Sequence, residues 1–247
     1  MNLSIGANQS QIDDNLIYAA IRSIEKAITE DVPNQFHENY METNNYLAFY
    51  RSDRINQNLR MLAVPAGADL HAFKRCSWRG RILIDHNSRL TFSICTEGTL
   101  RKIPLQTRRR PHYQQSMLKI LNGDLHGRYE QMKLFDTDPF DAETYAQDFD
   151  SISLGAIDPS EGYRHCIIVY RAVADELIEV KLVVLDPNFC TVNEINLSEY
   201  IKPDFSRLTA TEATSETTQE DHDAATKKLT SLKPGIKPKL REEEKRA

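Results

Sequence analysis

The chain of 247 residues has no apolar run near the roughly 18–20 residues that a membrane-spanning helix needs. Its N-terminus also lacks the cationic segment followed by an apolar stretch that marks a secretory signal. We therefore expect a cytoplasmic protein that makes no use of a membrane.

Cysteine is scarce, and its spacing excludes two common kinds of site. Cys76, Cys95, Cys166 and Cys190 lie too far apart for a zinc knuckle or a Cys-x-x-Cys redox pair. Reduced cysteines pack as small hydrophobic side chains, so we expect core thiols of a cytosolic protein. No metal site is expected.

The familiar motifs of catalysis are missing as well. The sequence contains no GxxxxGK[ST] loop, no GxGxxG after a strand, no HExxH and no GxSxG. Standard ATPases, dinucleotide-dependent enzymes, zinc proteases and α/β-hydrolases are therefore disfavoured, and no cofactor is expected.

The composition, 40% hydrophobic and 27% charged, is that of a globular protein. We predict a single α+β domain over residues 1–207, with a helical part at 1–60 and a sheet-rich part at 61–207. Apolar residues at helical spacing predict a helix over 9–30 that ends at Val32-Pro33. Residues 35–60 are expected to form one or two further helices.

Short β-branched and apolar segments predict a mostly antiparallel central sheet. The expected strands are 61–65, 70–74, 81–85, 90–95, 164–173, 177–185 and a last one near 190–195. A hairpin loop is expected at 86–89, and the short link at 174–176 makes 164–173 and 177–185 a central antiparallel pair. Helices are expected at 113–122 and near 141–149, with a helical turn at 197–201.

The composition changes beyond residue 208, where large apolar side chains become rare up to 226. Such a segment cannot bury enough surface to fold, so we expect a disordered tail over 208–247. The island at 232–240, Leu-Lys-Pro-Gly-Ile-Lys-Pro-Lys-Leu, is either a docking peptide for a protein partner or an uncollapsed part of that tail.

A basic block at residues 74–112 is the most informative feature that is present. It holds ten Lys or Arg and two acids, +8 in a chain of formal net charge −5. It also contains Trp78, the only tryptophan. Arginine and lysine neutralise phosphates, and Trp78 and Tyr113 would stack on bases if exposed, so a nucleic acid or other polyanion is one expected ligand.

An acidic block at residues 124–162 supports a competing interpretation. It holds ten acids and two bases, −8. The basic block could therefore be neutralised within the fold, or by an acidic partner protein, with no nucleic acid involved. The sequence leaves these alternatives open.

Arg108, Arg109 and Arg110 are the sharpest element of the basic block, since they precede Pro111 and a predicted helix start. Cations are unfavourable near a helix N-terminus, whereas an anion bound there would be stabilised by the arginines and by free backbone N–H groups. The alternative is a surface loop that binds nothing.

Two constellations indicate catalysis more weakly. Asp53, Arg75 and His112 would form a polar acid–base site if the fold brought them together. Alternatively, His112 is a capping or packed histidine and Asp53 an acid on a helix surface. The Glu-x-Lys at residues 179–181 matches a metal-dependent nuclease core, but the preceding strand lacks the required Asp, which favours a solvent-facing pair.

The order of segments resembles an uncharacterised family of bacterial and prophage-associated proteins that share a domain of unknown function. The segments that carry the resemblance are 51–58, 75–78, 112–113, 131–136, 200–205 and 232–240. The resemblance implies an accessory protein of a mobile element, active in phage conflict, in a toxin–antitoxin pair or in regulation. It would act by binding a macromolecule through the basic block; the alternative is a toxin-like nuclease that uses Asp53, Arg75 and His112.

Overall fold

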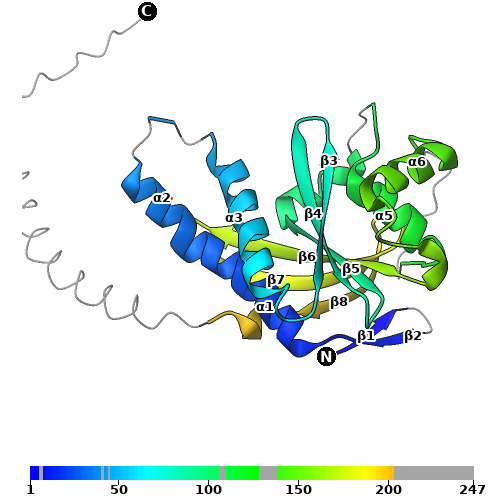
Figure 1. Ribbon diagram of the computed structural model, residues 1–247, viewed down its shortest axis with the longest axis horizontal. Coiled ribbons are helices and arrows are strands. Elements are labelled where there is room, and N and C mark those ends of the chain that lie inside the picture. Colours follow the sequence, from blue (N-terminus) through cyan, green and yellow to red (C-terminus); the bar gives the residue numbers. More distant parts are fainter. Residues whose placement is uncertain (6–7, 40–41, 44, 106–108, 128–137, 203–247) are drawn as a thin grey trace, which may run out of the picture. The chain divides into compact units, whose positions relative to one another are not determined.

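The computed structural model describes residues 1–5, 8–39, 42–43, 45–105, 109–127 and 138–202. Met1–Ile201 form one compact unit, in which helices lie against a six-stranded sheet (Figure 1). This confirms the predicted α+β class, with helices near the N-terminus and a mostly antiparallel sheet. The predicted disordered tail at 208–247, with its island at 232–240, lies outside the described residues. Among the described helices, none has the length and apolarity required to cross a membrane.

The helices are α1 (Asp14–Lys26), the π-helix η1 (Ala27–Asp31), α2 (Val32–Glu38), α3 (Leu47–Leu62), α4 (Glu97–Leu100), η2 (Ile103–Leu105), α5 (Tyr113–Leu121), α6 (Ala142–Ser153), η3 (Pro159–Glu161) and η4 (Ser198–Tyr200). The strands are β1 (Asn2–Ile5), β2 (Asn8–Gln11), β3 (Asp69–Arg75), β4 (Trp78–Asp85), β5 (Leu90–Thr96), β6 (Arg164–Val173), β7 (Glu176–Leu185) and β8 (Thr191–Asn196).

The large sheet has the strand order β3-β4-β5-β6-β7-β8. All neighbours are antiparallel except β5 and β6, which are parallel. Antiparallel neighbours need only short turns, whereas a parallel pair needs a long crossover. Residues 97–163, with α4, α5 and α6, form that crossover.

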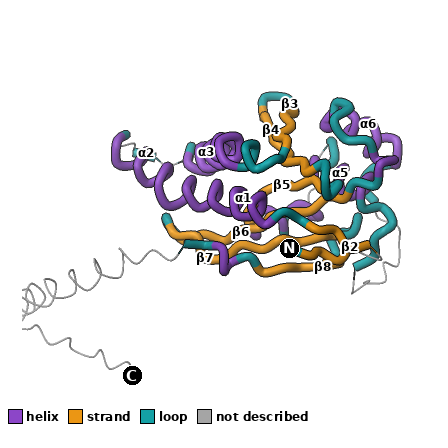
Figure 2. Tube along the Cα trace, turned by 60° about the horizontal axis from the view of Figure 1, so that its bottom comes forward, coloured by secondary structure: helices purple, strands orange, loops and turns teal. Residues whose placement is uncertain are grey.

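Both faces of the central strands are covered, which explains their continuous apolar sequence. In β6, Cys166 and Ile168 face the core beneath α1 and α3, while Ile167 and Val169 face α5. Figure 2 shows α1 and α3 along one face of the sheet. The prediction of a central antiparallel pair, now β6 and β7, is confirmed.

The predicted helix over 9–30 is wrong at both ends. Residues up to Gln11 belong to β2, and α1 begins only after Asp13, whose carboxylate caps it by accepting the N–H of Asn15 at 2.8 Å. At the other end Val32-Pro33 does not stop the helix. A π-turn intervenes, with the Val32 N–H bonded to the Ala27 carbonyl, so that Pro33 enters the first turn of α2, where its missing N–H does no harm.

The predicted strand at 61–65 is also wrong, because α3 continues to Leu62. Ile55, Leu59 and Ala63 are buried at intervals of four residues, so the apolar run prolongs a helical stripe. Gly67, at φ +97°, lies in the turn that leads into β3.

The hairpin of β3 and β4 stands between α3 on one side and α5 and α6 on the other in both views (Figures 1 and 2). Phe73, Ile82 and Ile84 bury its inner side against Met117 of α5 and Phe149 of α6. Cavities lie next to the tip of the hairpin, and Trp78 lines two of them.

Candidate polyanion-binding surface

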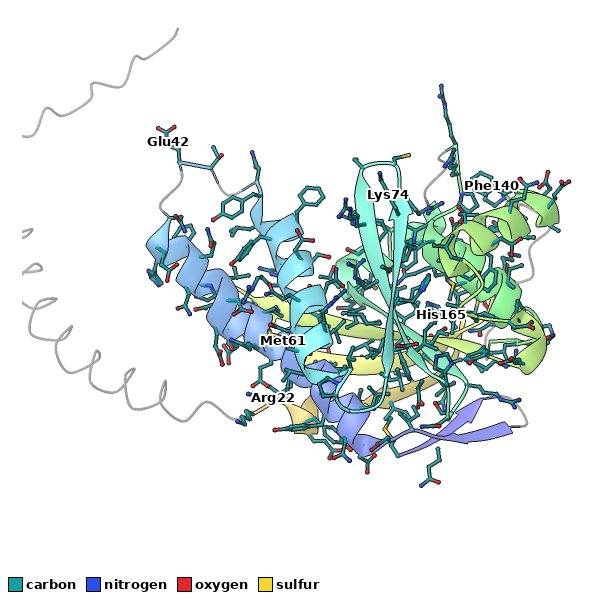
Figure 3. All side chains as sticks on the ribbon, viewed as in Figure 1. Arg22, Glu42, Met61, Lys74, Phe140 and His165 are labelled. Atoms are coloured by element: carbon teal, nitrogen blue, oxygen red, sulfur yellow. The ribbon has the colours of Figure 1, made fainter. Side chains whose placement is uncertain are left out.

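The tip of the hairpin presents the first part of the basic block. Arg75 and Trp78 face each other across the turn, and Cys76 takes a positive φ of 55° to close it. Lys74 lies close to this tip (Figure 3). In the register of β3 and β4, Arg75 lies opposite Trp78 and Lys74 lies opposite Arg79, so both strands carry cations near the tip.

Trp78 belongs to a cluster of four aromatic rings. Its ring centroid lies 5.5 Å from that of Phe73 and 5.5 Å from that of Tyr113, while Phe73 and Tyr113 are 5.3 Å apart. His112 adds a fourth ring at 4.7 Å from Tyr113. Trp78 remains 37% exposed, which is enough indole surface for stacking on a planar ligand.

Gly80 makes room for this cluster, and Gly80→Ala should disturb it. A Cβ at Gly80 would overlap the ring of Phe73 and lie 2.7 Å from that of Trp78. We expect a loss of about 1–3 kcal/mol of stability and a changed emission of Trp78. Chemical denaturation followed by tryptophan fluorescence measures both. Gly98→Ala is the control, because a Cβ there meets open space; equal effects of the two variants would contradict the packing argument.

Two cavities adjoin the hairpin, one at its tip and one between α3 and β4. The tip cavity, of about 570 Å³, is lined by Arg75, Cys76, Trp78, Arg109, Arg110, Pro111, His112 and Tyr113. The outer cavity, of about 270 Å³, is lined by Asp53, Asn56, Gln57, Arg60, Arg79 and Arg81.

A third cavity, the α3 cavity, lies between α3 and strands β4 to β6, with a volume of about 320 Å³. It shares Trp78, His112 and Tyr113 with the tip cavity and Arg81 with the outer one. The three cavities and the hairpin between them are called the hairpin surface below.

The hairpin surface carries a large excess of positive charge. Seven arginines line its cavities, and Asp53 is the one carboxylate among the described lining residues. Arg60, Arg79 and Arg81 form no ion pair with a described carboxylate. Neutralisation by the acidic block is visible in the described residues for one of the seven, Arg75, which pairs with Asp148 at 2.5 Å.

Arg75 and His112 both form hydrogen bonds that hold parts of the fold together. Arg75 also donates to the Pro111 carbonyl at 2.8 Å, and so joins β3, α6 and the segment before α5. His112 is the N-cap of α5: its Nδ1 accepts the Gln114 N–H at 3.3 Å, and its own N–H donates to Gln115 Oε1 at 2.6 Å. The capping interpretation of His112 is therefore confirmed.

The predicted site residues divide between the cavities. Arg75, Trp78, His112 and Tyr113 line the tip cavity together with Arg109 and Arg110, and Arg108 lies outside the described residues. Asp53 lines the outer cavity instead, so the predicted trio of Asp53, Arg75 and His112 does not share one cavity.

Two further arginines of α3 line these cavities without having been predicted as site residues: Arg51 in the α3 cavity and Arg60 in the outer cavity. They lie outside the basic block in sequence. Only the packing of α3 beside the hairpin brings them to it, and no local pattern in the sequence signals that contact.

The Glu-x-Lys pair of β7 forms an ion-pair chain away from these cavities. Lys181 Nζ lies 3.2 Å from Glu179 Oε1 and 3.1 Å from Glu194 Oε1. The hydrogen bond from Lys181 holds the pKa of Glu179 below its usual value. Among the described residues, no group of three or more His, Cys, Asp or Glu could hold a metal ion.

The prediction of core thiols holds for Cys166, which is buried, and fails for Cys76, which is exposed. Cys76 occupies the hairpin turn, where the chain reverses and its side chain meets no core. Burial raises the pKa of the Cys95 thiol, which lines the α3 cavity, to about 11, so it stays protonated at neutral pH.

No curated protein and no solved structure matches this chain. A family model does match, over residues 9–247. This confirms the resemblance to a domain of unknown function, whereas the bacterial and prophage setting stays a prediction. The chain belongs to a family of unknown function, DUF5986.

Proposed function

We propose that the protein binds a nucleic acid, as a single strand, through the hairpin surface. The observation that carries this proposal is that Arg60, Arg79 and Arg81, from α3 and β4, line the hairpin surface without any described carboxylate paired to them. The partly exposed Trp78 lines two cavities of the same surface and shares one of them with Arg81. In a chain of formal net charge −5, such a local excess of cations favours an anionic ligand.

A single strand fits this surface better than a duplex. Guanidinium groups fork onto phosphate oxygens, and bound phosphates release counterions. A single strand also offers unpaired bases, which stack on exposed aromatic rings. Trp78 lies between the tip cavity and the α3 cavity, where a base can reach it.

The alternative, a toxin-like nuclease, has less support. Its acid–base trio is divided, because Asp53 lines the outer cavity and Arg75 is paired with Asp148. The Nδ1 atom of His112 is engaged in capping α5. Cleavage of labelled RNA or DNA that disappears in Asp53→Asn would nevertheless establish this alternative.

The proposal is tested by fluorescence anisotropy with a labelled single-stranded oligonucleotide at several salt concentrations. Binding should weaken steeply with salt, and Arg79→Gln/Arg81→Gln should reduce the slope of log K against log salt by about 0.7 for each lost phosphate contact. Affinity that is independent of salt, or no binding at 50 mM salt, would reject the proposal.

Arg101→Gln is the matched control. Arg101 belongs to the same basic block in sequence, but it lines another cavity, with Leu100 and Val183, on the α5 face of the sheet. A single Arg79→Gln variant changes the net charge by the same amount. If both variants weaken binding equally, general charge rather than the hairpin surface is responsible.

The biological setting that we propose is that of an accessory protein of a bacterial mobile element, in the cytoplasm. It rests on the resemblance of segments such as 51–58 and 75–78. A neighbouring gene for a small helix-turn-helix protein would support a toxin–antitoxin or repressor pair. A protein partner for residues 232–240 is a separate proposal, tested by comparing the full chain with one that ends at residue 202 in binding experiments.

A further inference from the structure

The α3 cavity is lined by both buried apolar residues and polar residues. The apolar part of the lining is less than 5% exposed and consists of Ile55 and Leu59 of α3, Leu83 of β4 and Phe92 of β5. The polar lining comes from Arg51, Ser52, Asn56, Arg81 and Thr99. The cavity of about 320 Å³ lies near the lower end of the range of roughly 300–1,000 Å³ for small-molecule sites.

The polar groups of this cavity are suited to an anion. Arg51 and Arg81 come from different elements, and no carboxylate is among the described residues that line the cavity. The Nε atom of Arg51 is buried without a hydrogen-bond partner in the described structure. A buried donor without an acceptor is unfavourable, so an acceptor atom of a ligand would relieve it.

Arg51 lies beside Tyr170, a second residue that lines the cavity, and interacts with it by its charge and by a hydrogen bond. Burial raises the pKa of Tyr170, and the nearby charge of Arg51 acts against this effect. Tyr170 also lines the cavity and is 6% exposed. Because Tyr170 and the protonated Cys95 are both neutral, neither compensates the guanidinium charge.

A flat aromatic wall completes the site. Trp78, held at 5.5 Å from Tyr113, lines the cavity on the side of the hairpin. An aromatic ring stacks on a planar heterocycle, and the two arginines bind a phosphate. A ligand that has both parts satisfies the whole lining.

We infer that the α3 cavity binds one phosphorylated nucleotide, with its phosphate at Arg51 and Arg81 and its base against Trp78. The nucleotide is either free or the terminal residue of a strand, since both present the same chemistry. The inference deepens the proposed function and rests on it, because Arg81 and Trp78 belong to both sites. The volume admits one nucleotide and not a run of them.

The test titrates the full chain with nucleoside monophosphates, with the matching nucleosides and with inorganic phosphate, and follows the fluorescence of Trp78. Monophosphates should quench the emission with saturation, and nucleosides should bind about tenfold to a hundredfold more weakly, as expected for loss of hydrogen bonds to a charged group. Absence of quenching and of binding heat at millimolar monophosphate would overturn the inference.

Arg51→Met removes the arginine that lines the α3 cavity but neither the tip cavity nor the outer cavity. It should weaken monophosphate binding about tenfold or more, while Arg101→Met, in the cavity on the α5 face of the sheet, should leave it unchanged. Arg51→Lys keeps the charge without the fork and should fall between these results. Unchanged monophosphate affinity in Arg51→Met, with thermal unfolding as in the wild type, would refute the site even if oligonucleotides still bind in a salt-dependent way.

Oligonucleotides with and without a terminal phosphate distinguish the two sources of the nucleotide. Tighter binding of the phosphorylated strand, lost in Arg51→Met, identifies a strand end. Equal binding of both strands, together with Arg51-dependent binding of monophosphates, identifies a free nucleotide.

Discussion

Acidification from pH 6.5 towards pH 4 should destabilise this protein through His165, by about 1.4 kcal/mol for each pH unit. His165 is 0% exposed, and burial lowers its pKa from 6.5 to about 3. Above pH 6.5 the residue is neutral in both states and contributes nothing. As the pH falls, the unfolded chain binds a proton that the folded protein does not bind, so stability falls until the pH nears 3.

The contacts of His165 explain why the folded protein excludes that proton. Its ring lies between β5 and the crossover helix α5, with Thr91 Oγ1 at 2.9 Å from Nδ1 and Ser93 Oγ at 3.1 Å from Nε2. Both partners are neutral hydroxyls, and Gln114 donates to Ser93 at 2.7 Å. No described carboxylate pairs with the ring, so a charged imidazole would be buried without compensation. Figure 3 shows His165 in the interior of the unit.

Urea unfolding at pH 7, 6, 5 and 4 measures the effect, with His165→Gln as the reference protein. Glutamine keeps one donor and one acceptor for the two hydroxyls but does not titrate. The variant should be less stable at pH 7 and should lose less stability on acidification. Carboxylates such as Asp31 and Asp124 also have lowered pKa values, so they weaken both proteins alike at the acid end. Parallel curves for the two proteins would show that His165 does not carry the acid sensitivity.

Asp31→Ala should reduce the stability by about 3–5 kcal/mol, the second large effect. Asp31 ends the π-helix η1, and its carboxylate side chain is 7% exposed. Arg54 of α3 lies 2.8 Å away, Lys26 lies 3.1 Å away, and Asn58 donates to it at 2.9 Å. Burial acts to raise the pKa of Asp31, but the hydrogen bonds from Arg54, Asn58 and Lys26 together hold it below its usual value. Removal of the carboxylate leaves the partly buried Arg54 without a described carboxylate partner, while Lys26 keeps Glu30 and Asn58 keeps the Ser23 carbonyl.

Glu30→Gln is the control for this prediction. Glu30 pairs with the same Lys26 at 2.8 Å, but it is 53% exposed, so the expected change is about 0.5 kcal/mol or less. Thermal unfolding of both variants followed by circular dichroism gives the comparison. Similar losses in the two variants would mean that the buried position of Asp31 adds nothing to its ion pairs.

Features that depend on neighbouring residues can be predicted from this sequence, whereas features that depend on distant contacts cannot. Strands β6 and β7 were predicted because two β-branched segments are joined by a short link, and nothing distant is needed to pair them. The prediction of a strand at 61–65 was wrong because four consecutive apolar residues fit a strand or a helix equally well. Ala63 is buried one helical turn after Leu59, so these residues continue the buried side of α3. The π-turn at η1 has no sequence signature at all.

The candidate site also contains residues that the sequence grouped and residues that only the tertiary structure brings together. The tip cavity joins Arg75, Trp78 and Arg109 of the basic block with the adjacent Tyr113. The sequence grouped these residues by composition, but the fold brings the hairpin turn to the start of α5 across 36 residues, as in the contact of Arg75 with Pro111. Asp53 lines the outer cavity and not the tip cavity, and Arg51 lines the α3 cavity without having been predicted as a site residue. Both are on α3, and which side of a helix faces a distant hairpin depends on contacts between residues far apart in the chain.

The sequence by itself determined the α+β class, the apolar central strands and a concentration of arginine beside the single tryptophan, because composition and short-range periodicity encode these properties. The tertiary structure decided which charges remain uncompensated: it paired Arg75 with Asp148 and left Arg79 and Arg81 without a described carboxylate. It also placed Arg51 and Arg81 in one cavity with Trp78. Electrostatic energy depends on distance and burial, and both are set only when the helices and strands pack together.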